Sequence, residues 1–210
     1  ITDIGKIFQQ GIGVILTHTF NCKVVHNEIA RTCYTGISCG WSWGYRETIS
    51  RNNLIENNLI HDIGQAVLSD MGGIYLLGVQ PGTVIRGNHI YNVRSADYGG
   101  WGIYPDQASS HMLIEGNWVH DIQGSPFRIH FGKELIVRDN VFARSKEEGL
   151  IGIGKVEEHI AANISGNILI GPATGVFEGG YAGDVSKAFR SDANLIWFPD
   201  VKTPFGCSYP

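Results

Sequence analysis

Two aspartates and a set of aromatic and basic side chains lie close together in the middle of this 210-residue sequence. Asp70 and Asp106 stand beside two short β-prone runs, Gly73-Ile-Tyr-Leu76 and Gly102-Ile-Tyr-Pro105. A pair of carboxyl groups can divide the roles of general acid and base or nucleophile. Flat aromatic rings can stack on the apolar faces of sugars. The question for the rest of the chain is how it brings these groups together.

A repeat runs through the whole sequence and provides the scaffold. An Asn two residues before an aliphatic or aromatic side chain recurs at intervals of 31, 30, 29, 23, 27 and 27 residues. The seven positions are Asn27, Asn58, Asn88, Asn117, Asn140, Asn167 and Asn194. A period in this range is typical of a solenoid, with loops of different length inserted in each turn.

The repeat units are β-prone rather than helical. They contain β-branched runs with period-two alternation and abundant glycine, and they lack both a 3.6-residue period and the leucine-rich signature. The sequence therefore predicts an all-β fold, a right-handed parallel β-helix of about seven coils. At each corner the Asn side chain can bond backbone groups and the Asn of the next coil, forming a ladder.

A second alignment places one strand ahead of each ladder Asn. Its expected inward residues are Val14, Ile37, Ile74, Ile103, Phe127, Leu150 and Val176. Because successive side chains of a strand point to opposite faces, the residues that follow them point outward. On the central coils this outward face carries Tyr75, Tyr104, Asp106, Arg128 and His130.

Asp70 precedes its strand by four positions relative to Ile74, so a straight strand would hold it far from Asp106. Sharing a site requires a bend between Asp70 and Gly73, which Gly72 and Gly73 permit. The alternative for Asp70 is a turn cap that bonds the neighbouring backbone.

The amino-acid composition argues against several classes of binding partner. The net charge of -4 and only 16 Lys plus Arg give no basic stripe, so we expect no nucleic-acid partner. No apolar run approaches the roughly 18 to 20 residues of a membrane helix, so we expect no membrane segment. The eight histidines are scattered without ligand spacing, and no phosphate-binding or dinucleotide motif occurs. We expect neither a metal nor a cofactor.

We expect residues 1–210 to form a single β-helix domain. Residues 1–12 resemble the end of an earlier coil, and residues 198–210, with three prolines, resemble an exit segment. No amphipathic cap is evident at either end, although an uncapped β-helix exposes a sticky edge. The chain is therefore expected to be a piece of a longer rod, or to have its ends covered by something else.

Three stretches resemble secreted bacterial β-helix proteins related to polysaccharide-degrading glycoside hydrolases, a family with a pectin α-L-fucosidase and a xylanase. They are Asp70–Gly78, Tyr98–Ser110 and Arg128–Glu134, which together contain 29 of the 210 residues. The resemblance implies two catalytic aspartates, which match Asp70 and Asp106, and a secreted or periplasmic location. One departure is Gln107, where the family pattern has Glu.

These observations favour a glycoside hydrolase acting on a plant-type or other polysaccharide or oligosaccharide. Asp106 and Asp70 are the candidate catalytic residues, and the candidate substrate-binding residues are Tyr75, Tyr104, Trp101, Arg128 and His130. One alternative is a polysaccharide lyase, with Arg128 or Lys133 as the base. Another is a non-catalytic carbohydrate-binding or structural rod. This includes an enzyme that lost its activity because Gln107 stands where the family pattern has an acidic residue. The sugar, the stereochemical outcome and the oligomeric state stay open.

Overall fold

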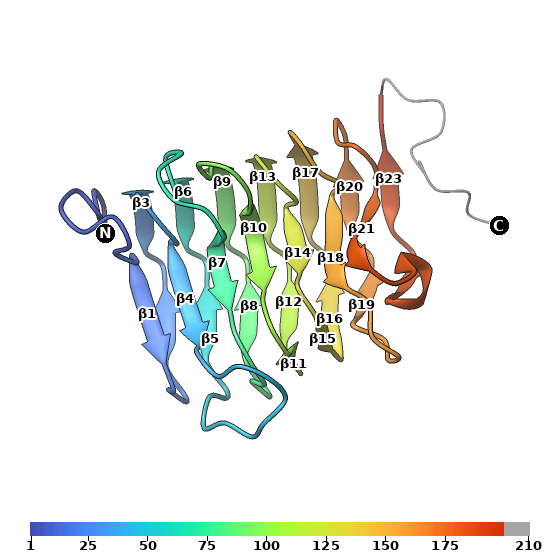
Figure 1. Cartoon of the computed structure of the whole chain (residues 1–210), viewed down its shortest axis with the longest axis horizontal. Helices are drawn as coiled ribbons and strands as arrows, with labels where there is room; N and C mark the ends of the chain where they lie inside the picture. The colour runs from blue at the N-terminus through green and yellow to red at the C-terminus, as the bar shows by residue number, and fades with distance from the viewer. Residues whose placement is uncertain (200–210) are drawn as a thin grey trace.

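The computed structural model describes residues 1–199 and shows a parallel β-helix, with strands stacked coil upon coil along a rod (Figure 1). Three seven-stranded parallel sheets form its sides. Sheet 1 contains β1(Val14–Thr17), β4(Ile37–Gly40), β7(Met71–Leu76), β10(Gly100–Pro105), β14(Phe127–Ile129), β18(Ile151–Lys155) and β21(Phe177–Ala182). The predicted all-β fold of about seven coils is confirmed.

The other two sheets follow sheet 1 in every coil. Sheet 2 contains β2(Lys23–Val25), β5(Leu54–Glu56), β8(Val84–Arg86), β12(Leu113–Glu115), β16(Leu135–Arg138), β19(Ala162–Ser165) and β22(Phe189–Asp192). Sheet 3 contains β3(Glu28–Thr32), β6(Leu59–Ile63), β9(His89–Val93), β13(Trp118–Ile122), β17(Val141–Ser145), β20(Ile168–Ile170) and β23(Leu195–Trp197). A small pair, β11(Ser109–Ser110) and β15(Gly132–Lys133), and the 3-10 turn η1(Val185–Lys187) complete the elements.

The core is a column of aliphatic side chains inside the rod. Each coil contributes at least one inward residue per sheet, for example Ile74, Ile85 and Ile90 in the third coil, all with no exposed surface. Because the coils stack, aliphatic side chains of successive coils contact one another along the axis of the rod. Their apolar surface is buried inside the coils, without a separate sheet or helix to cover it.

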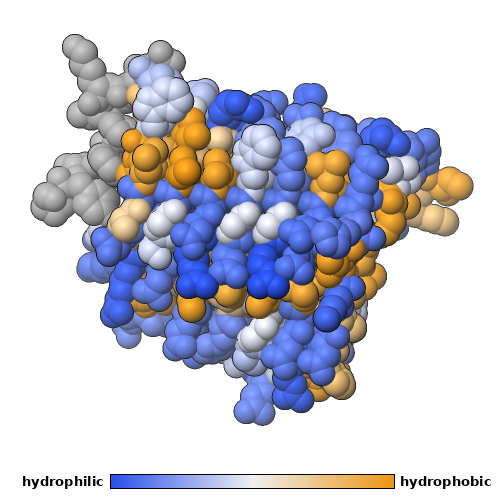
Figure 2. Space-filling model, turned by 180° about the vertical axis from the view of Figure 1, so that it is seen from behind, coloured by the Kyte–Doolittle hydropathy of each residue, from blue (hydrophilic) through white to orange (hydrophobic). Residues whose placement is uncertain are grey.

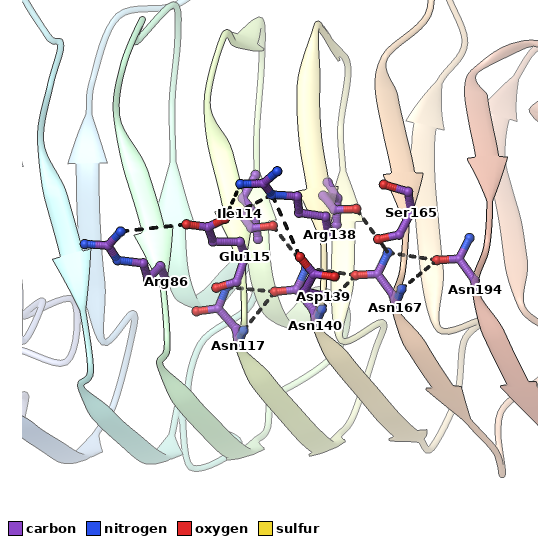
Figure 3. Close-up of polar contacts among 11 residues, drawn as sticks. Arg86, Ile114, Glu115, Asn117, Arg138, Asp139, Asn140, Ser165, Asn167 and Asn194 are labelled. Atoms are coloured by element: carbon purple, nitrogen blue, oxygen red, sulfur yellow. Dashed lines mark hydrogen bonds and ion pairs between the residues drawn. The ribbon is translucent and has the colours of Figure 1, made fainter.

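The Asn ladder at the corner between sheets 2 and 3 forms as predicted, and Figure 3 shows its last four members. The Nδ2 atom of Asn88 donates to Asn117 Oδ1 at 2.9 Å and to the Ile55 carbonyl at 2.9 Å. The Oδ1 atom of Asn88 accepts from the backbone N–H and the side-chain amide of Asn58. Each interior Asn therefore satisfies buried polar groups of two neighbouring coils.

Rings also stack from coil to coil on the outer face of sheet 3. Tyr91 lies between the parallel rings of His61 and His120, and His89 stacks on Trp118 with ring centroids 4.2 Å apart. The side opposite to the view of Figure 1 is otherwise covered by hydrophilic side chains with rows of hydrophobic ones between them (Figure 2). None of the described residues belongs to a helix that is long and apolar enough to cross a membrane.

The predicted register of sheet 1 is confirmed for the first five coils and is wrong by one residue in the last two. Phe127 pairs with Ile151, and Ile151 pairs with Phe177, where Leu150 and Val176 were expected. Leu150, Ile151 and Val176 are all apolar, and the first two have no exposed surface. Hydrophobicity alone therefore could not distinguish the two registers.

The ends of the chain were predicted to be a partial coil and an exit segment. Residue Thr2 makes a parallel bridge to Ala30 of β3, so the first residues lie beside sheet 3. Residue Phe198 is buried against Gly171. The rest of the predicted exit segment, residues 200–210, lies outside the described residues. The single-domain interpretation stays a prediction.

The ladder yields a test of stability. The substitution Asn88→Ala leaves the Ile55 carbonyl and two donors of Asn58 without partners in a buried place, which is expected to lower the unfolding free energy by roughly 2 to 5 kcal/mol. Urea unfolding measures the change. The control is Asn163→Ala on the exposed outer face of β19, which should change stability by less than about 0.5 kcal/mol. Equal effects of the two substitutions would contradict the ladder's role.

Candidate active site

Asp106 lies directly after β10, at the end of sheet 1, and is 7% exposed. Its backbone N–H donates to the Leu76 carbonyl of the preceding coil, which fixes its position. Three side chains donate to its carboxylate: Tyr75 at 2.5 Å, Tyr104 at 3.1 Å and His130 at 2.8 Å. These donors come from three successive coils, so the stacking register determines the geometry around Asp106.

This environment keeps Asp106 ionised. Burial acts to raise the pKa of its carboxyl, but the hydrogen bonds from His130, Tyr75 and Tyr104 outweigh burial and lower the pKa below 3.8. The Nδ1 atom of His130 faces Asp106, and its Nε2 atom lies 2.6 Å from the Tyr181 hydroxyl.

Asp70 reaches the same place from the start of β7. The residue has a φ of 58°, a left-handed conformation, so the bend occurs at Asp70 itself. The sequence predicted a bend between Asp70 and Gly73 that Gly72 and Gly73 would permit, but the two glycines lie within β7 and do not form it. Gly72 instead makes room: a Cβ there would stand 3.1 Å from Tyr104 Cβ.

The hydroxyl of Tyr104 stands between the two carboxyl groups, 3.3 Å from Asp70 Oδ1 and 3.1 Å from Asp106 Oδ1. Both oxygens are thus within roughly 6.5 Å of each other, compared with separations of ~5 to 9.5 Å in glycoside hydrolases. A phenol has one proton and donates to one acceptor at a time. When Tyr104 donates to ionised Asp106, its contact with Asp70 becomes a hydrogen bond if Asp70 carries a proton.

The pKa of Asp70 is shifted in the direction that this arrangement needs. Burial and the nearby charge of Asp106 raise it above 3.8, against the smaller lowering effects of Tyr104 and His130. The two aspartates therefore differ in the sense required of an acid and an ionised partner.

A cavity of about 410 Å³ opens in front of these groups. Six of the seven candidate site residues line it: Asp70, Asp106, Trp101, Tyr104, Arg128 and His130. The seventh, Tyr75, instead supports the site by donating to Asp106. Trp101 and Tyr104, which are predicted to bind sugar, are 6% and 4% exposed and form part of the cavity wall.

Arg128 and His130 can occupy their places in the cavity wall because the outer positions of β18 are glycines. A Cβ on Gly152 would stand 2.6 Å from Arg128 Cδ, and one on Gly154 would stand 3.0 Å from His130 Cδ2. Any larger residue would displace the two side chains. The corrected register of this coil is what puts these glycines, rather than Ile151 and Ile153, on the outer face.

Sequence reasoning missed four functional groups of the cavity wall, Tyr98, Glu148, Tyr181 and the side chain of Gln107. Glu148 Oε2 accepts from Trp101 Nε1 at 2.9 Å and from the Ser125 hydroxyl at 2.8 Å, and lies 3.4 Å from Arg128 Nη1. Glu148 directly follows the exposed Glu147 in a loop, and no sequence pattern indicates which of the two glutamates faces the cavity. Among residues 1–199, no three metal-ligating side chains are grouped to hold an ion.

With the geometry established, comparison with known proteins identifies the class. The chain belongs to the right-handed β-helix family, whose description "Right handed beta helix region" matches residues 3–167. It is similar in fold to DFA-IIIase from Arthrobacter chlorophenolicus A6, whose crystal structure was determined in complex with GF2.

The similarity to DFA-IIIase has a TM-score of 0.50 at 14% sequence identity. It covers 93% of this chain and 52% of the other, so this chain spans about half the length of that protein. Such a likeness concerns the fold alone. No curated protein matches the sequence.

The opposite pKa shifts predict opposite effects on stability. Ionised Asp106 stabilises the fold fully above pH 3.8, and this contribution is lost as the pH falls through its lowered pKa. For Asp70 the favoured form is protonated, so its contribution is complete below pH 3.8 and is lost as the pH rises through its raised pKa.

We therefore expect Asp106→Asn to be less stable than the wild type above about pH 4, with a difference that shrinks in acid. The substitution Asp70→Asn should gain stability relative to the wild type as the pH rises from about 4. Urea unfolding between pH 3 and 8 measures the two trends. The same pH trend in the two variants would contradict the assignment.

Proposed function

We propose that this protein hydrolyses glycosidic bonds in an oligosaccharide or polysaccharide. The observation that carries the proposal is the pair of carboxyl groups on either side of the Tyr104 hydroxyl, with their pKa values shifted in opposite directions. Asp70 acts as the general acid that protonates the leaving oxygen. Asp106 acts as the ionised partner.

The carboxyl spacing favours a particular route. Enzymes that retain anomeric configuration hold their carboxyl groups ~5 to 5.5 Å apart, and inverting enzymes need ~6.5 to 9.5 Å to admit a water molecule. The shared contact with Tyr104 limits the nearest oxygens of Asp70 and Asp106 to at most roughly 6.5 Å. We therefore favour Asp106 as the nucleophile of a double displacement, with Asp70 later acting as the base.

The surroundings suit this chemistry. Tyr75, Tyr104 and His130 would hold the Asp106 carboxylate in one orientation through the reaction. The Trp101 ring and the exposed Tyr98 and Tyr181 offer apolar faces and hydroxyl groups to a sugar. We also propose, from the resemblance of the sequence to secreted hydrolases, that the protein is secreted or periplasmic.

The lyase alternative receives less support. A base must give up its proton to accept one from the substrate, and an arginine side chain does not lose its proton in proteins. The Nη1 atom of Arg128 also lies 3.4 Å from Glu148 and 3.7 Å from Glu178, so protein carboxylates already occupy this guanidinium. Lys133 is not among the residues that line the cavity, and its Nζ lies over the Tyr45 ring. An assay for glycan hydrolysis distinguishes the proposed enzyme from a non-catalytic binding protein.

The proposal predicts that Asp70→Asn and Asp106→Asn each lower kcat by roughly 100- to 10,000-fold, because each removes an acid–base or nucleophilic group. The assay measures the reducing ends released from a panel of neutral and acidic glycans. Ultraviolet absorbance is recorded in parallel to detect unsaturated products. Circular dichroism checks that the fold is intact.

The matched control is Asp97→Asn, which removes a carboxylate from the exposed loop close to the site and should leave kcat within about twofold. Near-normal turnover in the two site variants would sink the catalytic assignment. Saturable binding without cleavage by the wild type would favour a binding rod, and an unsaturated product would favour a lyase.

A further inference from the structure

We propose that the cavity selects neutral sugars against uronic acids and that Glu148 sets this selectivity. The inference rests on the proposed function, because it names the substrate class of the same site. Its basis is the contact set of Arg128, which is the one permanently charged cation among the described residues that line the cavity.

Arg128 is already committed to carboxylates of the protein. Its Nη1 atom lies 3.4 Å from Glu148 Oε2 and 3.7 Å from Glu178 Oε1, and its guanidinium lies over the Trp101 ring at 5.6 Å. The side chain is 13% exposed. A sugar carboxylate would have to compete with two fixed carboxylates for this guanidinium in a poorly solvated place.

Glu148 is held in place and cannot easily move aside. Its Oε2 atom accepts from Trp101 Nε1 at 2.9 Å and from the backbone N–H and hydroxyl of Ser125 at 3.1 and 2.8 Å. Its own backbone N–H donates to the Ser145 hydroxyl. The carboxylate is therefore a fixed negative charge in the cavity wall, in the way that a preorganised site requires.

The charge balance follows from these contacts. Apart from His130, the wall contains the guanidinium of Arg128 against the carboxylates of Asp106 and Glu148, and Glu178 adds a second carboxylate beside Arg128. A uronate would meet like charges at short range, and repulsion between like charges is strong where water is displaced. A neutral sugar avoids this cost and finds donors and acceptors in Tyr98, Gln107 and Tyr181.

Binding to an inactive protein separates this inference from catalysis. The background variant is Asp70→Asn, which replaces an acid with a neutral amide of the same shape. The probes are linear trisaccharides of glucose, galactose and mannose and their counterparts with a carboxylate in place of the C6 hydroxymethyl group. Calorimetry at pH 7 and low salt gives Kd for each matched pair.

In this background we expect the neutral member of the best-binding pair to bind at least about tenfold more tightly than the acidic member. Adding Glu148→Gln keeps an acceptor for Trp101 and Ser125 but frees the guanidinium, and should shift the affinity ratio roughly tenfold towards the acidic sugar. The matched control, Glu147→Gln, removes the same charge from the exposed neighbouring residue and should leave the ratio unchanged.

The inference is overturned if the acidic members bind as well as the neutral ones, if no probe binds, or if Glu148→Gln and Glu147→Gln change the ratio equally. Failure of hydrolysis has a different signature. A wild-type protein that cleaves nothing, while the neutral preference and its dependence on Glu148 persist, would remove the proposed reaction and leave the selectivity intact.

Discussion

The structure depends on one constraint, that each coil must lie on the one before it in a fixed parallel register. Backbone hydrogen bonds of three sheets impose the spacing, and the Asn ladder fixes the corner where a slip would leave buried amides unpaired. Because register is transmitted from coil to coil, residues about 30 positions apart become neighbours. The donors around Asp106 are brought together by this stacking alone.

Chemical asymmetry then arises from an almost symmetrical arrangement. Tyr75 and Tyr104 occupy the same register position on adjacent strands, and each presents a hydroxyl to Asp106. The difference lies in Asp70, which enters from the opposite end of the strand and has fewer donors: Tyr104, whose one proton Asp106 already requires, and the exposed Tyr98. Two chemically identical side chains thus acquire different proton affinities from the number of donors that each can recruit.

The sequence predicted this architecture well where patterns repeat. The ladder positions follow from the Asn spacing, and four of the cavity residues, Tyr104, Asp106, Arg128 and His130, follow from alternation. Asp70 and Trp101 were named because they lie in the stretches that resemble glycoside hydrolases. Prediction was wrong at Leu150 and Val176, because runs of apolar residues fit two registers, and it missed Glu148 and Tyr181. Such groups reach the site through loop geometry and neighbouring coils, and no local pattern records where a loop returns.

The glycines of β18 have a wider consequence. The strand alternates Ile inside and Gly outside, so the core and the cavity are encoded by interleaved but separate sets of positions. The inner set determines whether the coil stacks, and the outer set determines how much space lies in front of the carboxyl groups. Substitutions at Gly152 and Gly154 would therefore act on Arg128 and His130, and through them on the cavity, while leaving the inward side chains of Ile151 and Ile153 unchanged.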